Sequence, residues 1–94
     1  MKVIIDGIRY DTSKCDLVAK VEEQNPRGRD TGFKVTSLFR AKDNKFLLCL
    51  DYVYKGRSLA GGTCVKVSPR KAFEFAEHIA NLDVLEAFFP LQVG

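Results

Sequence analysis

The sequence predicts an α+β fold in which a single antiparallel sheet, made of two hairpins and a short final strand, packs against a C-terminal helix. Two pairs of apolar segments meet at an Asp-Gly and an Asp-Asn dipeptide, at residues 6–7 and 43–44, which is typical of hairpins. A third apolar segment, 63–67, precedes Ser68-Pro69 and a stretch with apolar residues at helical spacing. With 94 residues and 46% apolar content, we expect residues 1–94 to form one domain around one modest core.

The N-terminal third predicts two short strands and one longer one. Residues 3–10 form a hairpin around Asp6-Gly7, because this pair accepts positive φ at both turn positions. The polar residues 11–13 supply N-cap chemistry for a helical turn at 13–16. Alternating apolar and polar residues then predict a strand over 17–23, and residues 25–32 contain only turn formers and polar groups, which predicts an exposed loop.

The second hairpin, turning at Asp43-Asn44, should bury one face. A two-residue turn pairs Ala41 with Phe46 and continues to Phe33 opposite Tyr54, so the aromatic residues share the core face. The other face then carries Lys34, Arg40, Lys42 and Lys45 together with Leu38 and Leu47. A slip of one residue would exchange the two faces, which makes this register testable.

The C-terminal segment predicts a helix that covers the sheet. Ser68 is its N-cap and Pro69 its first residue, and the predicted helix runs over 69–81. One side of it is apolar: Ala72, Phe73, Ala76, Ile79 and Ala80. A further short turn, capped by Asp83 with Glu86, ends at Phe89, before Pro90.

The three cysteines and the apolar pattern indicate a reducing compartment. Three is an odd count and no two cysteines have C-x-x-C spacing, so we expect reduced thiols rather than a disulfide framework or a zinc site. The opening apolar run is too short for a signal-peptide core, and no apolar stretch approaches the roughly 18 residues of a membrane span. We therefore expect a soluble protein of the host-cell cytoplasm with no membrane contact.

No residue pattern predicts catalysis. His78 is the only histidine and lies on the polar side of the predicted helix, without a nucleophile at a suitable spacing. The glycines of 56–63 match neither phosphate-loop pattern, and they precede a strand. Ser68-Pro69-Arg70-Lys71 resembles a minor-groove DNA-binding motif, but an N-cap explains its Ser and Pro. We predict no catalytic residues, no metal site and no cofactor.

Charge is segregated along the chain, and this is the strongest functional signal. Residues 26–71 hold eleven Lys and Arg against three Asp, a net charge of +8, whereas residues 1–25 carry −1 and residues 72–94 carry −4. Such a field steers oppositely charged partners. Lysines on a sheet also prevent aggregation, but ordinary surfaces intersperse acids among the bases. The predicted partner-binding residues are Arg27, Arg29, Lys34, Arg40, Lys42, Lys45, Lys55 and Arg57.

Several short motifs, in order, carry a resemblance. They are the opening 7–12 (Gly-Ile-Arg-Tyr-Asp-Thr), the hairpin 37–47, Gly61-Gly62, and 65–69 before an alanine-rich helix. This order resembles a group of small bacterial and mobile-element proteins, from which the chain departs at Asn44-Lys45, where those proteins have glycine, and in its basic 27–34 loop. Small phage-encoded proteins of this kind often inhibit host defences, including as anti-CRISPR proteins, so the resemblance implies such a role without assigning any residue.

Two functional hypotheses follow. The first is a non-enzymatic phage or mobile-element protein that inhibits a larger host-defence complex by occupying an acidic surface of that protein or ribonucleoprotein. The alternative is a nucleic-acid-binding module that contacts backbone phosphates, without stacking on bases because the predicted register leaves no aromatic residue among the bases. An enzyme would require a site supplied across a homodimer.

Overall fold

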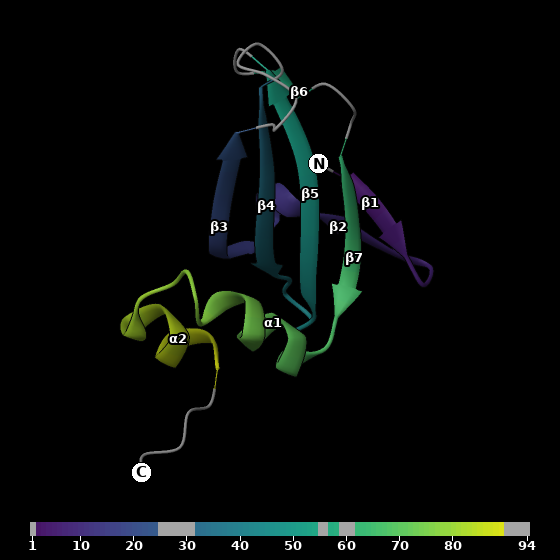
Figure 1. Ribbon diagram of the computed structural model, residues 1–94. Coiled ribbons are helices and arrows are strands. Elements are labelled where there is room, and N and C mark those ends of the chain that lie inside the picture. Colours follow the sequence, from purple (N-terminus) through teal and green to yellow (C-terminus); the bar gives the residue numbers. More distant parts are fainter. Residues whose placement is uncertain (1, 25–31, 55–56, 59–61, 90–94) are drawn as a thin grey trace.

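The computed structural model describes residues 2–24, 32–54, 57–58 and 62–89 and confirms the α+β fold (Figure 1). Its elements, in chain order, are β1 (Lys2–Ile5), β2 (Ile8–Asp11), a 3-10 turn η1 (Thr12–Lys14), β3 (Asp16–Gln24), β4 (Phe33–Arg40), β5 (Phe46–Tyr54), β6 (Arg57–Ser58), β7 (Thr63–Val67), α1 (Pro69–Ala76) and α2 (Leu82–Phe88). Most of the predicted 25–32 loop and most of the 56–62 connection lie outside the described residues.

The strands divide between two antiparallel sheets. The main sheet has the order β3–β4–β5–β7, and the short β6 pairs with the end of β5. Strands β1 and β2 pair only with each other and form a two-stranded sheet of their own. Figure 1 shows this hairpin behind the main sheet, while α1 and α2 lie in front of its lower end. The main sheet is therefore covered on both faces rather than on one.

The first turn has the predicted two-residue geometry. Asp6 and Gly7 have φ of 52° and 76°, which suits the type I′ turn that matches the twist of a hairpin. Ile5 consequently pairs with Ile8, and Val3 pairs with Tyr10. The prediction of this hairpin is confirmed.

The second turn differs from the prediction and shifts the register by one residue. Ala41 donates its amide to the Lys45 carbonyl at 2.8 Å, and Asn44 donates its amide to the Ala41 carbonyl at 3.0 Å. The loop therefore contains three residues, and Asn44 has a left-handed φ of 66°, as in a type I turn followed by a bulge. Arg40 then pairs with Phe46, and Phe33 pairs with Val53 rather than Tyr54.

This register places the predicted outer face of β4 on the same side as the predicted core face of β5. Leu38 and Phe46 face the helices, where they join a core of Val18, Ala19, Leu38, Phe46, Ala72, Ala76 and Phe89. Leu47 faces the N-terminal hairpin, in a second core of Tyr10, Ala41, Leu47 and Cys49. Because both faces are covered, Leu38 and Leu47 are both completely buried, with exposed fractions of 0%.

The helical region forms two short helices, where the sequence predicts a helix over 69–81 and a further short turn that Asp83 caps and that ends at Phe89. The Ser68 hydroxyl caps α1 by accepting the Lys71 amide at 3.2 Å, as expected, but α1 ends at Ala76 rather than at residue 81. Asn81 caps α2 by accepting the Val84 amide at 3.0 Å. The break lets the chain fold back so that Phe89, 6% exposed, stacks on Phe46 with ring centres 5.1 Å apart. Neither helix is long enough to cross a membrane.

The cysteines also differ from the prediction. Cys49 on β5 lies directly opposite Cys64 on β7, and the two form a disulfide, while Cys15 is a free thiol. The expectation of three reduced thiols is therefore wrong for two of them. Their separation of 15 residues has no recognisable spacing, and only the β5–β7 pairing brings them together.

Candidate functional site

The predicted basic face is divided by the observed register. Arg40 lies on the helix side of the sheet, where its guanidinium is 3.4 Å from the Asp16 carboxylate and its Cζ lies 4.5 Å from the centre of the Phe88 ring. These contacts hold α2 near the sheet and leave the Arg40 side chain partly exposed; its role in partner binding stays a prediction.

The other predicted residues are distributed over separate places. Lys34 is half-buried on β4, directly across from Tyr52. Lys42 and Lys45 are exposed in the β4–β5 turn. The backbone of Arg57 lies in β6, and Arg27, Arg29 and Lys55 lie outside the described residues. The described part of the chain thus does not gather the predicted residues into one patch.

A different set of cations surrounds a hollow, which we call the basic hollow. It has a volume of about 490 Å³ and lies between the N-terminal hairpin, η1 and the β4–β5 turn. Its cations come from all three segments. The lining residues are Lys2, Ile8, Arg9, Tyr10, Asp11, Lys14, Cys15, Ala41, Lys42 and Asp43.

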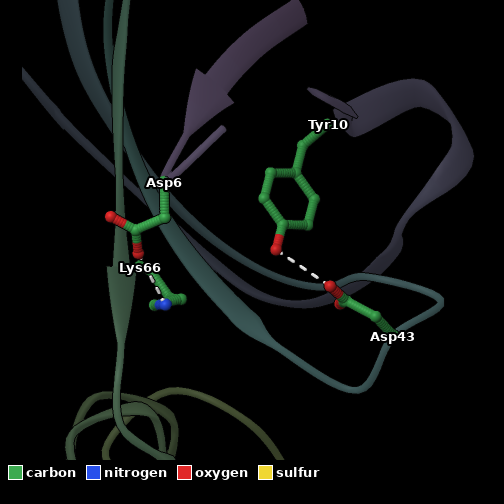
Figure 2. A network of polar contacts seen from close by, with 4 residues as sticks. All are labelled: Asp6, Tyr10, Asp43 and Lys66. Atoms are coloured by element: carbon green, nitrogen blue, oxygen red, sulfur yellow. Dashed lines mark hydrogen bonds and ion pairs between the residues drawn. The ribbon is translucent and has the colours of Figure 1, made fainter. Parts of the chain in front are cut away.

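One hydrogen bond joins the hairpin to the turn across this hollow. Tyr10, with an exposed fraction of only 5%, donates its hydroxyl to the Asp43 carboxylate at 2.9 Å. Figure 2 shows the Tyr10 ring extending from the hairpin toward the turn that carries Asp43. Burial raises the pKa of Tyr10, and the hydrogen bond to Asp43 raises it further, so the phenol is protonated at neutral pH.

A second contact fixes the other end of the hairpin. The Lys66 ammonium on β7 is 2.7 Å from the carboxylate of Asp6, the first residue of the hairpin turn (Figure 2). Their hydrogen bond and charge attraction lower the pKa of Asp6 and raise that of Lys66. The hairpin is therefore fastened to the main sheet at two places, and the positions of its cations relative to Lys42 follow from that.

The two carboxylates of the basic hollow already have hydrogen-bond donors. Asp11 accepts the Ser13 hydroxyl at 2.7 Å and the Ser13 amide at 3.1 Å, and these bonds lower its pKa. Burial opposes ionisation of Asp43, but hydrogen bonds from Tyr10 and the Lys45 amide outweigh burial and lower its pKa. Both groups are ionised at neutral pH and serve to shape η1 and the β4–β5 turn.

The four cations of the basic hollow have no such partners. Lys2, Arg9, Lys14 and Lys42 are exposed, and none of them forms an ion pair with a carboxylate within the described ranges. With Asp11 and Asp43, the lining carries four positive and two negative charges, a net charge of +2. The unpaired positive charge makes this hollow attractive to anions.

The only described thiol in the hollow is not activated. Cys15 donates its thiol to the Asp11 carbonyl at 3.3 Å. Burial raises the pKa of Cys15, and the nearby Asp11 and Asp16 charges raise it further. A thiol in this state is a poor nucleophile at neutral pH.

The histidine of the chain lies away from the hollow. His78 is exposed in the helical region, where its Nε2 is 3.6 Å from Oε1 of Glu77.

Sequence reasoning missed three of the four cations. Lys2, Arg9 and Lys14 belong to the segment 1–25, whose net charge is −1, so a count along the chain gave no signal. The predicted hairpin did contain a signal. A two-residue turn at Asp6-Gly7 places Lys2 opposite Asp11, and Arg9, two residues before Asp11 on the same strand, lies on the same face. Their proximity to Lys42 depends on the packing of the hairpin against the sheet.

Comparisons with models of protein families, with curated proteins and with solved structures find no match to this chain.

Proposed function

We propose that this protein is a non-enzymatic binding protein that docks on an acidic surface of a larger protein or ribonucleoprotein complex through the basic hollow. The observation that carries this proposal is the meeting of four exposed cations from three chain segments without an ion-pair partner among the described residues. Cations that stabilise the fold are paired, as Arg40 and Lys66 are. The four cations of the hollow are available to a partner.

The chemistry of these side chains suits recognition of carboxylates. The Arg9 guanidinium can bind a carboxylate with two parallel hydrogen bonds, whereas the three lysines act as compact charges with several donors each. Such a surface accelerates encounter with an acidic partner and excludes basic ones. The raised pKa of Cys15 supports a binding role for the hollow rather than a catalytic one.

The concrete form of this proposal is an inhibitor of a host-defence complex, of the anti-CRISPR type. Its support is the resemblance of the motifs at 7–12, 37–47 and 61–69 to small mobile-element proteins. Inhibition by occupying a surface requires no chemistry from the inhibitor, in keeping with a protein whose only described free thiol is protonated.

Binding of single-stranded nucleic acid is a second candidate, favoured by one observation. Tyr52 is 39% exposed and lies directly across from Lys34 on the sheet. An exposed aromatic ring beside a cation can stack on a base while the cation contacts phosphate. The predicted two-residue turn places Tyr52 on the core face, whereas the observed pairing places it beside Lys34.

Co-purification with a panel of purified host-defence effector complexes tests the first candidate. We expect the wild-type protein to be retained and the Lys14→Glu/Lys42→Glu variant to be lost, since two charges of the hollow are reversed. Lys71→Glu is the matched control, because Lys71 is an exposed lysine that does not line the hollow. Equal retention of the double variant and the wild type would exclude the hollow as the docking site.

An anisotropy titration with a labelled single-stranded oligonucleotide tests the second candidate. Affinity should fall steeply between about 50 mM and about 200 mM salt, because phosphate contacts release counterions. Tyr52→Ala should weaken binding further by removing the stacking ring. No binding at the lower salt concentration would eliminate this candidate.

A further inference from the structure

We propose that the basic hollow is also a site for a small ligand that carries two or more linked phosphates, as in pyrophosphate or the polyphosphate chain of a nucleotide. Because it uses the hollow assigned above, this inference rests on the proposed function and adds a ligand that would compete with the docking partner. It follows from the size of the hollow, its charge and the positions of its donors.

The size fits a small molecule. Small-molecule sites typically enclose roughly 300–1,000 Å³, and the hollow has about 490 Å³. Contact between two flat protein surfaces needs no concavity of this volume. A group that enters the hollow would meet cations from more than one chain segment.

The charge calls for a polyanion. The lining has a net charge of +2. Its carboxylates accept hydrogen bonds from Ser13, Tyr10 and the Lys45 amide, while Lys2 and Lys14 attract Asp11 through their charge only. One carboxylate would leave positive charge unneutralised, whereas two or more linked phosphates together bring at least two negative charges and several acceptor oxygens in a compact volume.

The donors come from three backbone segments that meet at the hollow. Arg9 belongs to β2, Lys14 to η1 and Lys42 to the β4–β5 turn, so the cations are fixed on separate backbone segments. The Tyr10–Asp43 hydrogen bond joins the first and last of these segments. Linked phosphates present several acceptor oxygens, which suits charge-assisted hydrogen bonds from cations on more than one segment.

The hollow also has an apolar wall, which leaves room for an uncharged part of the ligand. Ile8 lines it with an exposed fraction of 45%, next to the buried Tyr10 and Ala41. Inorganic triphosphate would use only the cations. A nucleoside triphosphate could in addition cover Ile8 and remove apolar surface from water.

Isothermal titration calorimetry of the full chain with pyrophosphate, inorganic triphosphate and adenosine triphosphate tests the inference, with sulfate as the simple-anion control. We expect one site per chain and weaker binding by sulfate. Lys14→Gln/Lys42→Gln should weaken polyphosphate binding by about tenfold or more, since two charge-assisted hydrogen bonds to phosphate are lost. Lys71→Gln should leave it unchanged.

A second experiment looks for a variant that binds polyphosphate more tightly. Asp11→Asn keeps a side-chain carbonyl to accept the Ser13 bonds but removes one negative charge from the lining, so polyphosphate should bind more tightly. Equal affinities for inorganic triphosphate and adenosine triphosphate would assign recognition to the phosphate chain. Tighter binding of adenosine triphosphate, reversed by Ile8→Ser, would assign it to a nucleotide.

Three results would overturn the inference: no binding of any polyphosphate at low salt, sulfate binding as tightly as triphosphate, or equal weakening by Lys71→Gln and the double variant. Failure here is distinguishable from failure of the proposed function. Partner capture that Lys14→Glu/Lys42→Glu abolishes, with no polyphosphate binding, would leave docking intact and reject the ligand. If the chain binds polyphosphate but Lys14→Glu/Lys42→Glu does not affect partner capture, the ligand site stands and docking through the hollow is rejected.

Discussion

Replacement of Leu38 or Leu47 by alanine distinguishes the observed register of the β4–β5 hairpin from the register that the sequence predicts. Leu38 is buried beneath the helices and Leu47 beneath the N-terminal hairpin, each with an exposed fraction of 0%. A two-residue turn would instead place both leucines together on the outer basic face. The three-residue turn thus predicts that both leucines are core residues, on opposite sides of one sheet.

The expected loss of stability is large for both. Full burial of a leucine side chain stabilises the folded state by about 1.5–3 kcal/mol. Leu→Ala substitutions in cores lower the free energy of unfolding by roughly 2–5 kcal/mol once the cavity is included. We expect Leu38→Ala and Leu47→Ala each to lower the free energy of unfolding by about 3 kcal/mol, a large share of the 5–15 kcal/mol typical of a domain. A residue on an exposed face would change it by only about 0.5 kcal/mol.

Urea denaturation followed by far-ultraviolet circular dichroism measures this difference. With a slope of about 2 kcal/mol per molar urea, a loss of 3 kcal/mol lowers the midpoint by about 1.5 M. Leu82→Ala is the matched control, since Leu82 is 61% exposed and its midpoint should barely move. If either core variant behaved like Leu82→Ala, the three-residue turn and the two-sided burial of the sheet would be refuted.

Three further predictions concern the turn, an ion pair and the disulfide. Asn44 has a left-handed φ, so Asn44→Gly should be neutral or stabilising in thermal melts while Asn44→Val should cost about 1–2 kcal/mol; equal melting of the two variants would contradict this turn. Because the pKa of Asp6 is lowered from its ordinary value of 3.8, Asp6 contributes stability at pH values above 3.8, and this is lost as the pH falls through the folded-state pKa. Because the pKa of Lys66 is raised from 10.5, Lys66 contributes stability at pH values below 10.5, and this is lost as the pH rises through its folded-state pKa. Asp6→Asn should therefore flatten both ends of the pH profile of the urea midpoint, and an unchanged profile would argue against the pair. Reduction of Cys49–Cys64, which are 15 residues apart, should lower stability by about 3 kcal/mol, and thiol titration of the unfolded chain should detect one thiol before reduction and three after; three thiols before reduction would exclude the bond.

Features that depend on neighbouring residues were predicted well. Asp6-Gly7 forms the expected turn because both residues tolerate positive φ at low cost. Ser68 caps the expected helix because its hydroxyl is placed to accept a nearby amide. Each of these outcomes is decided within a few residues of the chain, and the α+β class follows from their order.

The second hairpin could not be assigned in the same way. Asn44 is compatible with both a two-residue and a three-residue turn, and the flanking strands have apolar residues on both faces, so alternation does not select a register. The choice depends on what covers each face. Burial of Leu38 under α1 and α2 and of Leu47 under the hairpin favours the observed pairing.

The candidate site likewise combines features that are decided locally with features that depend on tertiary packing. The sequence by itself determined the fold class, the first hairpin, the start of α1 and the net positive charge of the chain, because these depend on local conformation and composition. Only the tertiary structure decided which cations meet, since Lys2, Arg9 and Lys14 reach Lys42 through the Tyr10–Asp43 and Asp6–Lys66 contacts. It likewise assigned Arg40 to the α2 interface and paired Cys49 with Cys64. The physical reason is that electrostatic and covalent contacts act through space, so a count along the chain cannot show which groups become neighbours.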